Sequence, residues 1–276
     1  MTFARMRRQT AQSAVIVPNV EPGPDPRRAV KSAERTVALL ELFSLYGRPL
    51  RIGAICRELR LPRSSANELV STLMRLGYLD YDPTAHAYLP NLRVAMLGAW
   101  LYDFHGINLD VELDHLVRRY GVTAILAIRN GVHTQYVRIQ WPETPGELEV
   151  QSGQLRPITA TSVGRAILST LPPAEIGPIV RRCNAEFPGF SVSVGDFMQA
   201  YQRIRQDGFA RSLTESPPGW RALAVGARVP DRSLTLGIGV LGREALIQAH
   251  EPALLAELLR IRTALDQNDD PMETHR

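Results

Sequence analysis

The sequence contains only two cysteines, Cys56 and Cys183, and they lie far apart along the chain. Neither belongs to a CxxC pair or to a cluster of cysteine and histidine, which argues against a disulfide framework and a structural zinc site. No apolar run approaches the roughly 20 residues that a membrane-spanning helix needs. The apolar stretch Val15 to Val17 is too short for the core of a signal peptide, so we expect a cytoplasmic protein.

Signatures of common enzymes are also missing, because the chain has no nucleophile elbow, HExxH, P-loop or paired-carboxylate pattern. The segment Gly237-Ile-Gly-Val-Leu-Gly242 has the spacing of a dinucleotide-binding loop. Only a helix and a polar tail follow it, which leaves no room for the next strand of a dinucleotide-binding unit. We therefore expect no enzymatic activity, no cofactor and no metal, and a glycine-lined strand that a ligand or a helix approaches closely.

Lysine is almost absent, since Lys31 is the only one and every other base is arginine. Residues 1–90 contain 13 Lys and Arg against 8 Asp and Glu, whereas the remainder contains 19 against 20. An excess of basic residues in the first third of a chain whose remainder is nearly neutral is typical of a nucleic-acid-binding domain. A solvent-exposed surface without any nucleic-acid partner would give the same excess of basic residues.

The first 90 residues divide into an arm and a small domain. Residues 1–28 lack periodicity and contain four prolines, which predicts a disordered arm that is either an idle tail or a basic contact to DNA phosphates. Ser32 is a candidate N-cap for a helix that ends at Gly47. Residues 29–90 as a whole predict a winged helix-turn-helix domain.

The tight turn at Arg60-Leu61-Pro62 separates two further helices, Ile52–Leu59 and Ser64–Leu76. The apolar face of the latter consists of Leu69, Val70, Leu73 and Leu76. Alternating aromatic and small residues around Asp82-Pro83-Thr84 predict a β-hairpin, the wing. The turn sets the last helix across the one before it, so we expect its polar face to project outward.

The remainder predicts a linker helix, an α+β domain with one antiparallel sheet over residues 107–268, and a polar tail over residues 269–276. The linker, residues 91–106, contains a helix at Leu92–Phe104 with more apolar surface than a lone helix leaves in water. We expect it to pack against its own copy in a dimer or against the neighbouring domain. The later predicted elements are a helix at Leu109–Tyr120, strands near Thr123–Arg129, Thr134–Gln140 and Glu147–Gln151, helices near Ser162–Thr170, Ala174–Asn184 and Val194–Gln206, strands at Gly208–Leu213, Arg221–Arg228 and Leu234–Leu241, and a helix at about Arg243 to Gln267.

The Ser64–Leu76 helix is the candidate for insertion into the major groove of DNA. Arginine and asparagine make bidentate contacts with guanine and adenine, and serine can bond phosphate or base. The remaining candidates, in the first helix, the turn and the wing, would contact phosphates. The DNA-binding candidates are Arg35, Arg51, Arg63, Ser64, Ser65, Asn67, Thr72, Arg75, His86 and Tyr88.

Several motifs follow one another along the chain: Lys31-Ser-Ala-Glu-Arg35, Leu61-Pro-Arg-Ser-Ser65, Leu73-Met-Arg-Leu-Gly-Tyr78, Ile158-Thr-Ala-Thr-Ser-Val-Gly-Arg-Ala-Ile-Leu168, Gly208-Phe209 and Glu215-Ser-Pro-Pro-Gly219. In their order and spacing they resemble the IclR family of bacterial transcriptional regulators over roughly residues 30–268. The resemblance implies a GAF-like effector-binding domain, homodimers or dimers of dimers, and palindromic operators in double-stranded DNA. It also implies a ligand among the turn at Thr159–Gly164, the strand after Gly219 and the strand that ends at Leu241. The effector-binding candidates are Thr159, Ala160, Thr161, Ser162, Val163, Gly164, Leu213, Ala222, Gly239 and Leu241.

The chemistry of these positions suggests the class of ligand. The N-terminal end of the Ser162 helix suits a carboxylate, although capping by Thr159 or Thr161 would equally explain the motif. Family members that bind small keto acids tend to have Asp, Cys and a Ser-x-Ser pair at positions matching Ser212 or Leu213, Ala222, Gly239 and Leu241. This chain replaces most of those polar groups with apolar or small ones, so we expect a partly apolar acid, such as an aromatic carboxylate.

The sequence thus predicts a ligand-responsive regulator, expected to be a repressor, in which effector binding changes the spacing of two DNA-binding heads. Half-sites should lie about 10 base pairs apart, or a multiple of this. Glu68 departs from the resemblance, because the family more often has a basic residue there, and it either alters operator preference or lies off the DNA. Two alternatives stay open: an enzyme that acts on a small acid through the C-terminal domain, and a DNA-binding protein without an effector.

Overall fold

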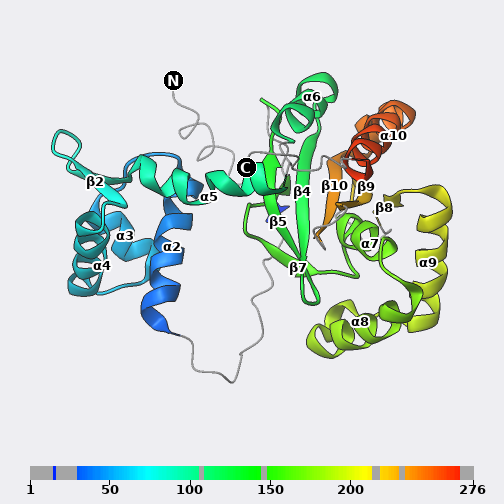
Figure 1. The fold of residues 1–276 in the computed structure, drawn as a ribbon, viewed down its shortest axis with the longest axis horizontal. Coiled ribbons are helices and arrows are strands. Elements are labelled where there is room, and N and C mark those ends of the chain that lie inside the picture. Colours follow the sequence, from blue (N-terminus) through cyan, green and yellow to red (C-terminus); the bar gives the residue numbers. More distant parts are fainter. Residues whose placement is uncertain are drawn as a thin grey trace, which may run out of the picture. The chain divides into compact units, whose positions relative to one another are not determined.

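The computed structural model describes residues 15–16, 30–105, 109–143, 148–212, 218–229 and 234–267. These residues form two compact units, one with residues 30–105 and one with residues 109–267 together with residues 15–16. Each unit has its own elements and hydrophobic core (Figure 1).

The first unit is a three-helix cluster followed by a hairpin and a further helix. Its elements are α2 (Lys31–Tyr46), α3 (Ile52–Leu59), α4 (Arg63–Arg75), β2 (Leu79–Asp82), β3 (Ala87–Pro90) and α5 (Leu92–His105). The core forms where the apolar faces of α2, α3 and α4 meet, around Leu39, Ile55 and Val70. This arrangement confirms the predicted helix-turn-helix and hairpin.

Two local predictions about these helices were wrong. Ser32 is not the N-cap of α2, because the carbonyl of Val30 already accepts hydrogen bonds from Ala33 and Glu34, so the helix starts two residues earlier. Leu76 does not face the core: α4 ends at Arg75, and the side chain of Leu76 beyond it is 45% exposed.

The hairpin turn is fixed by its own side chains. Asp82 Oδ1 accepts hydrogen bonds from the backbone N–H groups of Thr84 and Ala85, at 2.8 and 3.0 Å. His86, with φ of 49°, closes the loop in the left-handed region before Ala87 pairs with Asp82. The Asp-Pro-Thr segment thus forms the predicted wing.

The second unit is built on a six-stranded antiparallel sheet in the order β7-β5-β4-β10-β9-β8, as predicted for an α+β domain. Its strands are β4 (Thr123–Asn130), β5 (His133–Gln140), β7 (Leu155–Pro157), β8 (Ala210–Arg211), β9 (Trp220–Val229) and β10 (Leu234–Arg243). Its helices are α6 (Asp110–Tyr120), α7 (Ser162–Ser169), α8 (Pro173–Glu186), α9 (Val194–Asp207) and α10 (Glu244–Asp266), with a short 3-10 helix, η1, at Pro188–Phe190.

Helices cover both faces of the sheet, and each face has its own core. On one face α7 packs directly against the sheet, α9 packs against α7, and α8 packs against α9 (Figure 1). The core on this face includes Ile125 and Ala127 of β4. On the other, α6 and α10 pack against β9 and β10 around Leu223 and Ile238. The alternation of β4 between the two cores explains why its central segment, Ala124–Ile128, is apolar at every position.

Three short strands departed from the prediction. Strand β7 was not predicted, because three residues that include Arg156 and Pro157 are too few to show alternation. The strand expected at Glu147–Gln151 is only β6 (Leu148–Glu149), which pairs in parallel with β1 (Val15–Ile16). Val15 and Ile16 are the only described residues of the predicted disordered arm, the rest of which lies outside the described part of the chain.

Candidate nucleic-acid interface and ligand site

Helix α4 has one buried and one exposed side. Ala66, Val70 and Leu73, spaced at four and three residues, are at most 5% exposed and contact the core of the first unit. The opposite side is exposed and almost entirely polar: it consists of Arg63, Ser64, Asn67, Glu68, Ser71, Thr72 and Arg75, with Ser65 half-buried at its border. The polar side is therefore exposed to solvent, as the sequence predicted.

The turn before α4 leaves the N-terminal end of this helix without a side-chain cap. Arg60 adopts the left-handed conformation, with φ of 52°, and Leu61 donates a backbone hydrogen bond to Cys56 at 3.0 Å. Pro62, the N-cap residue, is extended and its side chain has no acceptor. The first-turn N–H groups of α4 lie next to the exposed Arg63 and are therefore available to donate hydrogen bonds to a phosphate.

The other DNA-binding candidates fall into two groups. Arg35 on α2 and His86 on the wing are exposed, and His86 Nδ1 lies 3.1 Å from the hydroxyl of Tyr81. Arg51 and Tyr88 stabilise the wing itself: Arg51 Nε donates to the carbonyl of Ala85 at 3.1 Å, and Tyr88 forms a backbone bridge with Leu50. The side chain of Arg51 and the ring of Tyr88, which lies 5.1 Å from that of Tyr81, thus have local partners that sequence reasoning did not foresee.

The effector-binding candidates at Thr159–Gly164 surround the start of α7. Thr161 caps this helix, since its Oγ1 accepts a hydrogen bond from the N–H of Gly164 at 3.0 Å and lies 3.1 Å from Oγ1 of Thr134. Thr159 is buried, with its hydroxyl 3.3 Å from Sγ of Cys183. Ala160 is half-buried, and Ser162 and Val163 are buried in the first turn. Capping by Thr161, one of the two interpretations of this motif, is what the structure contains.

The candidates on the sheet lie beneath α7. Ala222 of β9 and Leu241 of β10 are paired across the strands and are half-buried. A Cβ atom at Gly239 would lie 2.6 Å from Cγ1 of Val163, so this glycine lets α7 approach the strand. All three glycines of the Gly237–Gly242 segment lie inside β10, not in a loop before a helix. Leu213 lies outside the described residues.

Sequence reasoning missed Arg165, a buried guanidinium in the second turn of α7. It is 6% exposed, its Nη2 donates to the backbone carbonyl of Arg211, and its Nε has no hydrogen-bond partner. Burial lowers the pKa of Arg165 to about 10. The signal that the sequence offered was that Arg165 is the only charged residue in the small and apolar run Val163–Leu168.

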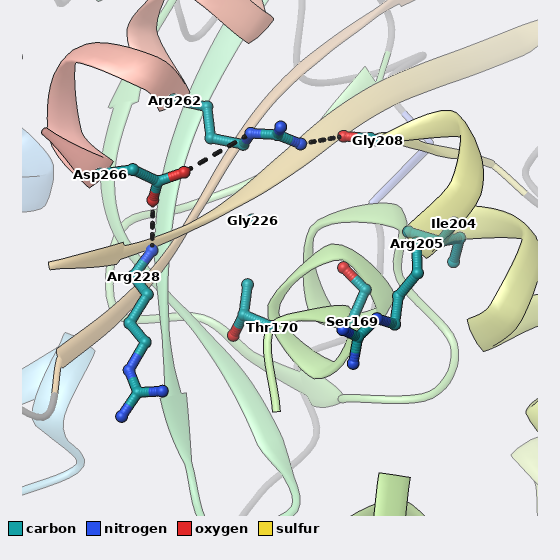
Figure 2. A pocket seen from close by; sticks show the side chains of 9 residues that line it. All are labelled: Ser169, Thr170, Ile204, Arg205, Gly208, Gly226, Arg228, Arg262 and Asp266. Carbon is teal, nitrogen blue, oxygen red and sulfur yellow. Dashed lines mark hydrogen bonds and ion pairs between the residues drawn. The ribbon is translucent and has the colours of Figure 1, made fainter. Parts of the chain in front are cut away.

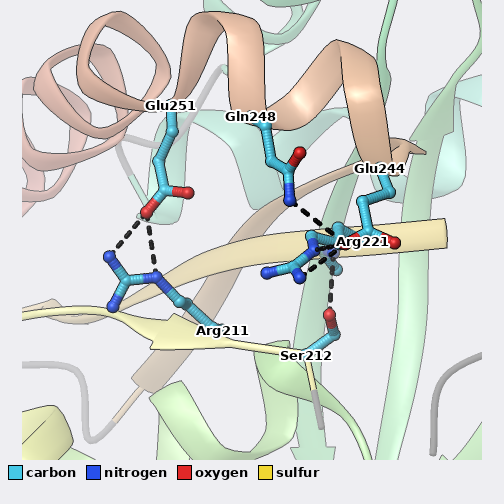
Figure 3. A network of polar contacts seen from close by, with 7 residues as sticks. Arg211, Ser212, Arg221, Glu244, Gln248 and Glu251 are labelled. Carbon is cyan, nitrogen blue, oxygen red and sulfur yellow. Dashed lines mark hydrogen bonds and ion pairs between the residues drawn. The ribbon is translucent and has the colours of Figure 1, made fainter. Parts of the chain in front are cut away.

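Polar side chains connect the adjoining edge of the sheet to α10 (Figure 3). Ser212 and Ala222 form a backbone hydrogen bond at 2.9 Å, and Ser212 Oγ also accepts from the N–H of Ala222 at 3.2 Å. Arg211 and Arg221 pair with Glu251 and Glu244 of α10, respectively, with Nε to oxygen distances of 2.9 and 2.8 Å. The edge next to Arg165 is thus polar and well fixed, whereas Ala222 and Leu241 present apolar groups.

Two negative findings apply to the described part of the chain. No three His, Cys, Asp or Glu side chains gather there in a way that could hold a metal ion. Within the same residues, every helix is too short or too polar to serve as a membrane span.

Comparisons with known proteins match both units. Residues 32–83 match the family described as the IclR helix-turn-helix domain, and residues 107–266 match the family described as the bacterial transcriptional regulator IclR C-terminal domain. The chain is 26% identical over 200 residues to the HTH-type transcriptional regulator XynR of Escherichia coli strain K12, which covers 71% of this chain and 79% of that protein.

Solved structures have the same fold. An IclR transcriptional regulator from Alicyclobacillus acidocaldarius aligns with a TM-score of 0.62 and 22% identity, over 87% of this chain and 98% of that one. An IclR homologue from Microbacterium hydrocarbonoxydans, solved in complex with 4-hydroxybenzoate, aligns with a TM-score of 0.62 and 15% identity, over 85% and 98% of the two chains.

Proposed function

Because this chain belongs to the IclR family of transcriptional regulators, we propose that it is a repressor that binds a palindromic operator and releases or secures it in response to an aromatic carboxylate. As a regulator of transcription it acts in the cytoplasm and has no catalytic role. The observation that carries the proposal is the exposed polar side of α4.

The chemistry of that side supports recognition in the major groove. Arg63 and Asn67 lie four residues apart, so both face the same way from the first two turns of α4. Both are exposed, and their side chains match the hydrogen-bonding edges of guanine and adenine. Thr72 and Arg75 lie further along the helix and would contact the phosphate backbone, together with Arg35 and the wing.

The first experiment measures operator affinity by fluorescence anisotropy at a fixed salt concentration. Arg63→Ala and Asn67→Ala should each weaken binding by about 1–3 kcal/mol, because each removes a bidentate base contact. Arg118→Ala is the matched control for Arg63→Ala, since Arg118 is exposed on α6 in the other unit and the charge change is the same. Unchanged affinity in both α4 variants would refute the proposed interface.

Apolar chemistry around α7 supports an aromatic effector. The half-buried Ala222 and Leu241 cannot supply the hydrogen bonds that a small keto acid needs in a buried site. The 4-hydroxybenzoate complex of the Microbacterium hydrocarbonoxydans homologue belongs to the same chemical class. We place the acid group between the first turn of α7 and the β8 edge, where the unpaired Nε of Arg165 can donate to it.

Ligand titrations test this assignment. 4-Hydroxybenzoate should raise the melting temperature and change operator affinity at lower concentration than pyruvate or glyoxylate do. Leu241→Ser should weaken the response to 4-hydroxybenzoate, whereas Leu241→Met, which keeps an apolar side chain, should not. Tighter binding of the keto acids would mean that the effector is a small polar acid.

The exposed apolar side chains of α5 support a homodimer or a dimer of dimers. Leu92 and Met96 are 73% and 57% exposed and lie four residues apart on one face, and Leu97 beside them is 54% exposed. A palindromic operator requires two copies of α4, and burying this face against a second copy would join them. Light scattering of Met96→Glu, compared with the wild-type chain, should detect loss of the larger species.

A further inference from the structure

A cavity of about 540 Å³ lies at the C-terminal end of α7, at the opposite end of that helix from Thr161–Gly164. It is bounded by α7, α9, β9 and α10 (Figure 2). Its lining residues are Ser169, Thr170, Ile204, Arg205, Gly208, Gly226, Arg228, Arg262 and Asp266. The volume is within the range of about 300–1,000 Å³ that small-molecule sites have.

The charge of this lining is strongly unbalanced. Arg205, Arg228 and Arg262 contribute three positive charges, and Asp266 contributes the single negative one. Asp266 is itself engaged, because its Oδ1 accepts from the backbone N–H of Arg228 at 2.9 Å and its Oδ2 lies 3.7 Å from Nε of Arg262. The cavity therefore has an excess of two positive charges, which favours an anion.

The three guanidinium groups are held differently. Nη1 of Arg262 donates to the carbonyl of Gly208 at 2.9 Å, while its buried Nε has no hydrogen-bond partner. Nη1 of Arg205 donates to the hydroxyl of Tyr201 at 2.8 Å. Among the described residues the guanidinium of Arg228 has no partner, and in Figure 2 it extends away from Asp266. Most of their N–H donors thus stay available to a ligand.

Two hydroxyl groups between the arginines add a further constraint. Ser169 Oγ donates to the carbonyl of Ala166 at 2.7 Å, and Thr170 Oγ1 donates to that of Ile167 at 2.8 Å. Since each hydroxyl hydrogen is already used, both oxygens can only accept hydrogen bonds from a ligand. The cavity therefore suits a molecule that combines acid groups with hydroxyl donors.

We propose that this cavity is a second ligand site, distinct from the site under the start of α7, and that it binds a hydroxylated organic polyanion. The acid groups are carboxylates or phosphates, because both match the fork of the guanidinium group. Arginines from three separate elements, α9, β9 and α10, favour a ligand with at least two separated acid groups over a single small anion.

A purely structural role for the arginines is the competing explanation. Arg262 caps the C-terminal end of α9 through Gly208, and a cation there is favourable without any ligand. This explanation does not account for the side chain of Arg228. This residue lies on β9, and among the described residues it contacts Asp266 through its backbone N–H only. Arg228 is therefore the residue that separates the two explanations.

Isothermal titration calorimetry of the full chain tests the proposal at fixed ionic strength. The probes are citrate, a hydroxylated tricarboxylate, and glucose 6-phosphate, a sugar phosphate, with acetate as a monoanion. At least one polyanion should bind with a Kd of about 1 mM or tighter, and acetate should not. Arg228→Gln and Arg205→Gln should each weaken that binding by about tenfold, because each removes a charge-assisted hydrogen bond.

The matched control is Arg203→Gln, which removes the same charge from an exposed position on α9 outside the lining. Its affinity should stay within about twofold of the wild type. The better of the two polyanions identifies the acid group as carboxylate or phosphate. The proposal is overturned if neither polyanion binds, or if Arg228→Gln and Arg203→Gln bind equally well.

Discussion

Helices α4 and α7 both start at a short turn with small polar residues nearby, but the two helices lie in opposite surroundings. Helix α4 starts at Pro62 without a side-chain cap and has one polar face in water. Helix α7 starts at Thr161 with a side-chain cap and is buried from Ser162 to Leu168. The first is a surface that other molecules can reach, and the second is part of the core that holds a domain together.

The neighbours of each helix cause this difference. Helix α4 packs through its Ala66, Val70 and Leu73 side, so its other side is exposed to solvent. Helix α7 lies between the sheet and α9, and glycines beneath it, such as Gly226, leave no room for a side chain. Substitutions should therefore change DNA affinity in α4 and stability in α7.

The largest expected effect comes from adding a side-chain atom where α7 is already tightly packed. A Cβ atom at Gly164 would lie 2.3 Å from both the carbonyl oxygen of Ile158 and Oγ1 of Thr134, so Gly164→Ala forces buried atoms apart. We expect it to lower the free energy of unfolding by about 3 kcal/mol, measured by urea denaturation.

Gly53→Ala provides the matched control in the first unit. Gly53 lies in α3 with nothing within 4 Å of an added Cβ atom. The same substitution there should raise stability by about 0.5–1 kcal/mol, because alanine favours the helix. If both variants lost the same stability, the contrast between the open and the packed region would be wrong.

A buried tyrosine of the second unit gives the next largest effect, at alkaline pH. Burial raises the pKa of Tyr136 from 10.0 to about 12, against a smaller opposing influence of Arg156. The folded chain thus keeps a proton that the unfolded chain loses above pH 10. The corresponding stability is complete below pH 10 and disappears as pH rises toward 12, which amounts to about 2–3 kcal/mol.

Tyr136→Phe should remove this alkaline loss, which urea denaturation at several pH values above 9 would measure. Tyr81→Phe is the control, since Tyr81 lies on the wing and is 41% exposed. That variant should retain the wild-type slope of stability against pH. An identical slope in all three proteins would mean that Tyr136 is not buried in solution.

The contrast between the exposed α4 and the buried α7 also explains which features the sequence could predict. Elements defined by local signals were found: the predicted and observed bounds of Ile52–Leu59 agree, and the Asp82-Pro83 turn gave the wing. The exposed side of α4 was also predictable, because helical periodicity alone separates its two faces.

Features made by distant segments were not predictable. Periodicity cannot identify the burial of α7, because apolar and small residues surround the helix on all sides. The arginine-lined cavity brings together Ser169 and Arg262, which lie more than 90 residues apart. The unpaired Nε of Arg165 likewise depends on where β8 passes, which a single sequence does not encode locally.

The smallest expected effect concerns the capped and uncapped ends of the two helices. Thr161→Val keeps the shape of the side chain but removes the acceptor for Gly164 and the contact with Thr134, so it should cost about 1 kcal/mol of stability. Thr72→Val on the exposed side of α4 should change stability by less than about 0.5 kcal/mol, while it weakens operator binding. Urea denaturation and operator titration of both variants should therefore give opposite patterns. If Thr161→Val were as stable as Thr72→Val, the N-terminal end of α7 would be open like that of α4, and its N–H groups would be free to bind the carboxylate that we propose for the effector.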